Sequence, residues 1–332
     1  MNRLVENADL VDASSWHAQA WQRLDAAYQR QQLAHALLIS GVPGIAKGRF
    51  AEQLVAKLFC LSPNDGRACG QCKNCHLVAA DTHPDLITIK LQEDKKRIGV
   101  EQVRETLQKL EKTAQIGPVK VAIIRQLELL TRGAFNAILK TLEEPGRDTY
   151  WVLQCEQLQD VPATIKSRCL HVPLFPLSKE MAQAWLLTQG YTQPAIANVW
   201  PYCPGAPLSI QYWLDNDVLS EREKFRQNLH GLASGQLSLS ENIDVTDQDS
   251  IPFLIDALYE EVLIKVRERS VQPEKAQDRQ NRSYLNFLQQ VLDEKRYVQM
   301  NQGANRVGVW SSLLISWIEL HQELIHSSKV VA

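Results

Sequence analysis

The 332-residue sequence contains no apolar run that approaches the ~20 residues needed to span a membrane. Residues 1–12 lack the charged-then-apolar pattern of a secretion signal. The formal net charge is −2, which argues against a broadly basic nucleic-acid-binding surface, although local DNA contacts within an assembly stay open. These absences predict a soluble, cytoplasmic protein without a membrane partner, and the length suffices for two or three domains.

Apolar periodicity divides the chain into two parts. Before about residue 175, short apolar strands alternate with amphipathic helices, which predicts a parallel sheet flanked by helices. The expected strands are 35–40, 86–91, 121–124, 150–154 and 169–172, and the expected helices are 14–32, 50–61, 100–113 and 135–142. Beyond 173–176, helical patterns dominate: two short helices within 178–210, then long amphipathic segments near 251–262, 284–292 and 310–320.

Residues 41–48 have the outline of a phosphate-binding loop with parts missing. The working motif is G-x-x-x-x-G-K-[ST], and here Gly41 and Lys47 stand in register, with Gly44 between them. Ala46 replaces the second glycine, and Gly48 supplies no hydroxyl for Mg²⁺. The alternative is that Lys47 is an ordinary solvated lysine in the first turn of a helix.

The second acidic site of a nucleotide hydrolase is also missing. Carboxylates are needed at the end of a neighbouring strand to hold Mg²⁺ and the attacking water. The candidate strand 121–124 is followed by Arg125 and Gln126, where Asp-Glu would be expected. We therefore expect no hydrolysis at this chain's own site. Nucleotide binding without hydrolysis, through Lys47 and backbone amides, stays open.

Seven cysteines in a chain without a secretion signal indicate thiols or metal ligands rather than disulfides. Three have C-x-x-C-x-x-C spacing and a fourth precedes them by nine positions: Cys60, Cys69, Cys72 and Cys75. Four thiolates predict a closed, structural Zn²⁺ site. A thiol-exchange role is the competitor. His76 or His83 could replace Cys60 as the fourth ligand.

The third motif is Ser167-Arg168-Cys169, which precedes an expected strand. An arginine in such a place is usually the partner of a surface ion pair. It can also stabilise the transition state of phosphoryl transfer on a neighbouring protein. The residues alone do not choose between these roles.

Taken together, four segments resemble the bacterial clamp-loader family of AAA+ proteins. They are 35–44, the cysteine cluster followed by Thr82-His-Pro-Asp85, 134–145 and 162–169. Their order and spacing fit that family over residues 15–210, and the helical remainder fits more loosely. The resemblance implies an α/β AAA+ domain with a zinc insertion (1–175, insertion 60–76), a small helical lid domain (176–210) and an all-α collar domain that joins subunits into a ring (211–332).

The resemblance also implies residue roles. Some subunits of the family lack the intact loop and the Asp-Glu pair, as this chain does, and have no ATPase activity of their own. The sensor arginine of active members would fall at Leu208. The family's Ser-Arg-Cys motif supplies an arginine finger in trans, which maps to Arg168. The family's zinc module corresponds to the four cysteines.

The partners implied are gamma/tau-type ATPase subunits and a delta subunit, with the sliding clamp and primed DNA reached through the complex. The chain would then be part of a DNA-directed DNA polymerase holoenzyme. Two other functions remain open at this stage. One is an active gamma/tau-type ATPase that uses Lys47, and the other is a zinc-dependent nucleic-acid-binding protein.

Overall fold

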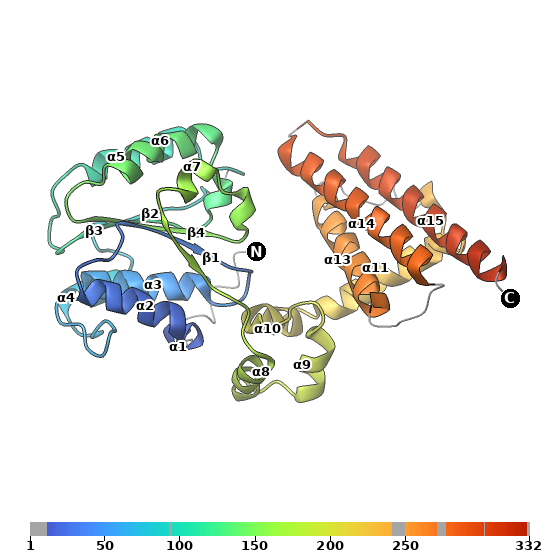
Figure 1. Cartoon of the computed structure of the whole chain (residues 1–332), viewed down its shortest axis with the longest axis horizontal. Coiled ribbons are helices and arrows are strands. Elements are labelled where there is room, and N and C mark those ends of the chain that lie inside the picture. The colour runs from blue at the N-terminus through green and yellow to red at the C-terminus, as the bar shows by residue number, and fades with distance from the viewer. Residues whose placement is uncertain (1–11, 93–94, 241–249, 271–276, 302, 331–332) are drawn as a thin grey trace. The chain divides into compact units, whose positions relative to one another are not determined.

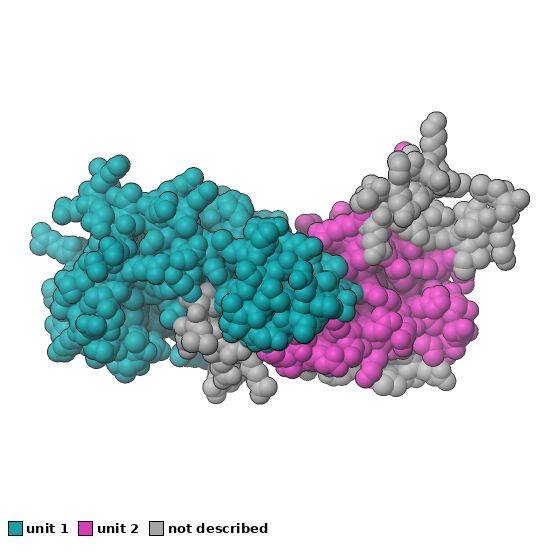
Figure 2. All heavy atoms as spheres, turned by 90° about the horizontal axis from the view of Figure 1, so that it is seen from below, with its two compact units in different colours: residues 1–212 teal, residues 213–332 magenta. Residues whose placement is uncertain are grey.

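The computed structural model describes residues 12–92, 95–240, 250–270, 277–301 and 303–330. The chain divides into two compact units, residues 1–212 and 213–332, which Figure 2 distinguishes by colour. Among the helices of the described residues, none is both long and apolar enough to cross a membrane. The prediction about a secretion signal concerns residues 1–12, of which 1–11 lie outside the described residues.

A five-stranded parallel sheet forms the centre of the first unit (Figure 1). Its order is β2-β3-β4-β1-β5, so β5 lies at one edge. The strands are β1 Ala36–Ser40, β2 Leu86–Ile89, β3 Lys120–Ile124, β4 Thr149–Cys155 and β5 Leu170–Pro173. All five predicted strands are confirmed, with small differences at their ends. The predicted fold class, a parallel sheet flanked by helices with an all-helical C-terminal part, is likewise confirmed.

Helices cover both faces of the sheet (Figure 1). Every residue of β1 is buried, with Leu37 and Ile39 in the core on one side and Leu38 in the core on the other. The first face carries α1 Ala13–Trp16, α2 Ala18–Gln29, α3 Lys47–Phe59 and α4 Lys73–Ala79. The second carries α5 Val100–Leu110, α6 Arg132–Glu143 and α7 Ala163–Lys166. Two short 3-10 turns, η3 Leu127–Leu129 and η4 Leu158–Asp160, follow β3 and β4.

Two local differences from the sequence expectation have simple causes. The single helix expected over 14–32 is two helices, because His17 ends α1 and starts α2. Helix α4 lies in the segment around the cysteines, where no helical periodicity was apparent. It is only seven residues long, too short to show an amphipathic repeat.

Three helices follow the sheet within residues 178–215, where two were expected. They are α8 Lys179–Thr188, α9 Gln193–Val199 and α10 Pro207–Asp215. Helix α10 begins with a proline, which is favourable in a first helical turn, and it runs past residue 210. The domain boundaries 1–175, 176–210 and 211–332 stay a prediction.

The described part of the second unit is helical, as predicted. Its helices are α11 Val218–Ala233, α13 Ile251–Ser270, α14 Gln277–Met300 and α15 Arg306–Val330. The three expected apolar stripes form its core, which includes Ile251, Leu258, Val291, Trp310 and Trp317. Helix α11 was not predicted, because charged and polar residues dominate its sequence.

Asp85, in the Thr-His-Pro-Asp segment, holds the turn between α5 and β3. Its carboxylate accepts three backbone N–H bonds, from Gln115 at 2.7 Å, Ile116 at 2.9 Å and Gly117 at 2.8 Å. Burial alone would raise the pKa of Asp85, but these three donors lower it overall. The stability that this carboxylate contributes is therefore complete above its usual pKa of 3.8, and it is lost as the pH falls below that value.

We expect Asp85→Asn to lower the free energy of unfolding at pH 7 by about 2–4 kcal/mol, because an amide cannot accept all three bonds. The difference between wild type and variant should shrink as the pH falls below 4. Urea unfolding at pH 7 and in acid measures both effects. Asp81→Asn, at an exposed position nearby, is the control. A constant difference at every pH would contradict the assigned role.

Candidate functional sites

The glycine loop, residues 41–48, joins β1 to α3 and keeps the backbone shape of a tight turn. Gly44 has φ +81° and Ala46 has φ +62°, both in the left-handed region. That region is unfavourable by about 1–2 kcal/mol for a residue with a Cβ. Position 46 therefore does need the freedom that glycine normally supplies, as its place in the motif predicts. The loop adopts the shape although alanine occupies this position.

Three carbonyl oxygens of the loop region accept hydrogen bonds from the chain's own donors. The Lys47 ammonium donates to Gly41 O at 3.0 Å. The backbone N–H of Leu208, in α10, donates to Gly44 O at 3.0 Å. His17 Nε2 lies 2.7 Å from Ile45 O. Burial lowers the pKa of His17, so the ring is neutral at pH 7 and donates through Nε2.

Two acidic residues that sequence reasoning missed lie just beyond the C-terminal ends of β3 and β4, the same end of the sheet as the glycine loop. Glu128 belongs to η3 after β3, and Glu156 directly follows β4. The N–H of Glu156 donates to Glu128 Oε1 at 3.1 Å. Burial lowers the pKa of Lys47, and the charges of Glu156 and Glu128 oppose that shift. Burial also raises the pKa of Glu128. Their positions just beyond two central strands were the available signal.

The end of β3 has a basic residue where a hydrolase has a carboxylate. Arg125 forms an ion pair with Glu52 of α3, with Nη1 and Oε1 2.7 Å apart. Gln126 is exposed. A Cβ on Gly48 would meet only Gln154 Oε1, at 3.9 Å, so the space beside this position is open but no hydroxyl is present. The residues at positions 48, 125 and 126 supply no anionic ligand for Mg²⁺.

The four predicted metal ligands come together in space. The sulfurs of Cys60, Cys69, Cys72 and Cys75 all lie within 4.8 Å of one another. Cys75 Sγ is 3.9 Å from Cys69 Sγ and 3.5 Å from Cys72 Sγ. Sulfurs placed tetrahedrally at about 2.3 Å from Zn²⁺ are about 3.8 Å apart, so the spacing suits a metal ion. His76 and His83 are not members of this group.

Backbone N–H groups lower the pKa of Cys69 and Cys72 and so favour their thiolates, whereas burial raises the pKa of Cys60 and Cys75. The N–H groups of Cys69 and Cys72 point to the sulfurs of Cys60 and Cys69 at 3.2 and 3.3 Å. Donors that include the N–H of Gln71 lower the pKa of Cys69 to about 6. Gly70, with φ +72°, makes the turn between Cys69 and Cys72. These groups can therefore hold a metal ion, with the donor chemistry that zinc prefers.

Arg168 lies beside the N-terminal ends of the strands, whereas the glycine loop follows the C-terminal end of β1. It follows α7 and precedes β5, whose Leu170 pairs with Leu37 near the start of β1. The five residues of β1 lie between the two ends of the sheet, and each adds about 3.3 Å along the strand. Arg168 Nε donates to Glu143 Oε1 at 2.6 Å, and Nη1 donates to Thr164 O at 2.8 Å. A side chain at this end of the sheet cannot reach the loop of its own chain.

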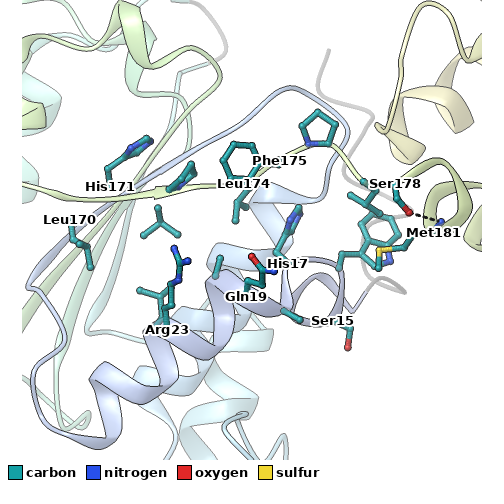
Figure 3. Close-up of a pocket in the computed structure, with 18 residues that line it drawn as sticks. Ser15, His17, Gln19, Arg23, Leu170, His171, Leu174, Phe175, Ser178 and Met181 are labelled. Carbon is teal, nitrogen blue, oxygen red and sulfur yellow. Dashed lines mark hydrogen bonds between the residues drawn. The ribbon is translucent and has the colours of Figure 1, made fainter.

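A separate cavity of about 500 Å³ runs between α1–α2 and residues 170–178 (Figure 3). Its walls are largely apolar, and Phe175 is 70% exposed beside it. Figure 3 shows Arg23 extending from α2 toward β5; it is the one Lys, Arg, Asp or Glu among the described residues that line the cavity. Residues 41–48 do not line it, so the cavity is not an extension of the glycine loop.

The family model described as "DNA polymerase III, delta subunit" matches residues 16–178. The chain is 31% identical over 328 residues to DNA polymerase III subunit delta' of Pseudomonas aeruginosa, covering 94% of this chain and 99% of that protein. It is 36% identical over 220 residues to subunit tau/gamma of Haemophilus influenzae, covering 64% of this chain and 32% of that protein.

One solved structure is also similar. A DNA polymerase III gamma subunit-related protein from Thermotoga maritima aligns over 91% of this chain and 99% of its own, with a TM-score of 0.46 and 16% identity.

Proposed function

The chain belongs to the family of DNA polymerase III delta' subunits of the clamp loader, and from this premise we propose that it is a subunit that hydrolyses no nucleotide itself and acts on its neighbour's. In this role Arg168 supplies an arginine finger to the ATP site of an adjacent gamma/tau-type subunit. The assembly, with a delta subunit, loads the sliding clamp onto primed DNA during replication in the cytoplasm.

The separation of Lys47 from Arg168 is the observation that carries this proposal. Lys47 and Arg168 lie at opposite ends of the strands of one parallel sheet, so they cannot both contact the same nucleotide. A ring of similar subunits brings the arginine end of one subunit to the loop end of the next. Arg168 then meets a neighbour's phosphates, and Glu143, which is half exposed, must release it.

The chain's own loop supports the other half of the proposal. Gly48 and Arg125 stand where a Mg²⁺ ligand and a carboxylate belong in a hydrolase. Lys47 donates to Gly41 O instead of projecting freely toward a phosphate. Leu208 occupies the sensor position, and its side chain is buried. Catalysis needs these groups together, so the loop serves as scaffold.

The cysteine cluster is proposed to hold a structural Zn²⁺ ion. The four sulfurs of Cys60, Cys69, Cys72 and Cys75 would be its ligands, and the closed site leaves no position for a substrate. The metal would tie the end of α3 to α4, because Cys60 directly follows α3 and Cys75 lies within α4. Thiol exchange would need only the partly exposed pair Cys69 and Cys72, whereas the two buried sulfurs of Cys60 and Cys75 in the same cluster favour a closed metal site.

The proposal is tested first on the isolated chain. Calorimetric titration with Mg·ATP should give no binding at millimolar nucleotide and no release of phosphate. Mg²⁺-dependent binding with turnover would favour the active ATPase instead. The chain should also copurify with delta and gamma/tau-type subunits. Salt-dependent binding of the isolated chain to primed DNA, without those subunits, would favour the zinc-dependent nucleic-acid-binding protein.

A further inference from the structure

The first turn of α10 lies directly against the glycine loop. Besides the bond from the Leu208 N–H to Gly44 O, the Leu208 side chain is 5% exposed in the same apolar cluster as Ile45 and Ala46. A Cβ on Gly44 would lie 2.6 Å from Ser209 N and closer still to the Ser209 hydroxyl. With φ +81° and this close approach, a side chain at position 44 would strain the loop and displace Ser209. The loop and the helix are therefore fitted to each other at this residue.

The positive charge of Lys47 is countered by carboxylates of the same chain. A phosphate-binding lysine reaches the β- and γ-phosphates, but here the ammonium bonds to Gly41 O and feels the carboxylates of Glu128 and Glu156. Glu128 Oε2 is buried and has no hydrogen-bond partner among the described residues. An incoming phosphate would therefore compete with these two carboxylates for the Lys47 ammonium.

We propose that the chain's own groups latch the glycine loop in this conformation: the first turn of α10 holds Gly44, and Glu128 and Glu156 compete with any incoming phosphate for the charge of Lys47. The inference rests on the proposed function, in which this chain binds no nucleotide. It adds two causes to the replacement of the motif's second glycine by Ala46 and of its hydroxyl residue by Gly48. It also explains how α10 keeps one position against the loop when no nucleotide is there to set it.

The latch is tested by hydrogen exchange of the Leu208 amide in the full chain. Gly44→Ala should speed that exchange about tenfold or more, because the new Cβ pushes Ser209 away. Gly48→Ala is the matched control, since its Cβ meets open space, and it should leave exchange unchanged. Amides of β1 and β4 report whether Gly44→Ala is still folded. If it is not, Leu208→Ala replaces it, with the same expected increase. Unchanged Leu208 exchange in a folded variant would overturn the latch.

The effect of Glu128 and Glu156 on nucleotide binding is tested by titrating Mg·ATP into the wild type and two variants. Wild type should bind no Mg·ATP, and Ala46→Gly with Gly48→Thr should restore little, leaving Kd above about 1 mM. Adding Glu128→Gln, Glu156→Gln and Leu208→Ala should tighten binding about tenfold or more. Micromolar binding by the two-residue repair alone, or no gain from the added changes, would overturn the inference. Binding by wild type would instead contradict the proposed function, so the two failures are distinguishable.

Discussion

Arg168→Ala is expected to slow ATP hydrolysis at the adjacent subunit by about 10³–10⁵-fold, the contribution of an arginine finger supplied in trans. The guanidinium would neutralise charge that develops on the transferred phosphoryl group. The measurement needs a reconstituted assembly in which only the nucleotide site next to this chain is active, because other sites would mask the loss.

Two further variants separate chemistry from structure at this end of the sheet. Lys166→Ala removes a positive charge from α7 two residues away and should leave hydrolysis nearly unchanged. Arg168→Lys should recover little, because an ammonium lacks the planar, forked donor geometry of a guanidinium. Assembly of the complex, followed by size-exclusion chromatography, should be normal for all three variants. Unchanged ATP turnover at the neighbouring site in Arg168→Ala would show that Arg168 is not an arginine finger.

Cys72→Ser is expected to reduce bound zinc from one ion per chain to nearly none. Without the metal, only protein contacts hold this region, such as the bond from Asn74 Nδ2 to Phe59 O at 3.0 Å and the ion pair of Arg67 with Asp12 at 2.8 Å. Binding free energy of a structural zinc site contributes directly to folding. We expect a loss of roughly 3 kcal/mol or more in stability, with early exposure of residues 60–79.

Metal analysis by mass spectrometry and urea unfolding measure these two effects together. Cys203→Ser is the control, because Cys203 lies outside the cluster and should affect neither metal content nor stability strongly. Chelation of wild type should reproduce the Cys72→Ser unfolding curve. A full complement of zinc in Cys72→Ser would show that this sulfur is not a ligand.

The features predicted best from the sequence were those that depend on residue type and spacing alone: the buried strands, the cysteine cluster and the glycine loop. Strands β1 and β3 are buried on both faces, so each leaves a continuous apolar run, such as Ala36–Ile39. Four cysteines at short spacing announce a metal cluster whatever the surrounding fold. The Ala46 substitution was recognisable because the motif demands glycine at that position, and its φ of +62° gives the physical reason.

What the sequence did not predict depends on contacts between distant segments. His17 lies 28 residues before its partner Ile45, and Leu208 lies far beyond Gly44 along the chain. Neither residue belongs to a motif, and only the packed fold brings them to the loop. Helix α10 was missed for a related reason: Gly205 and Pro207 suggest a turn, yet proline is well placed in a first helical turn.

The edge strand β5 has a consequence for the free subunit. The N–H of Leu174 donates to Ser40 O of β1, so by the alternation of a strand Pro173 faces the unpaired side. Proline offers no N–H there, and an incoming strand would lose a hydrogen bond at that point. Outside the proposed assembly, the last residue of β5 thus protects the chain against edge-to-edge aggregation.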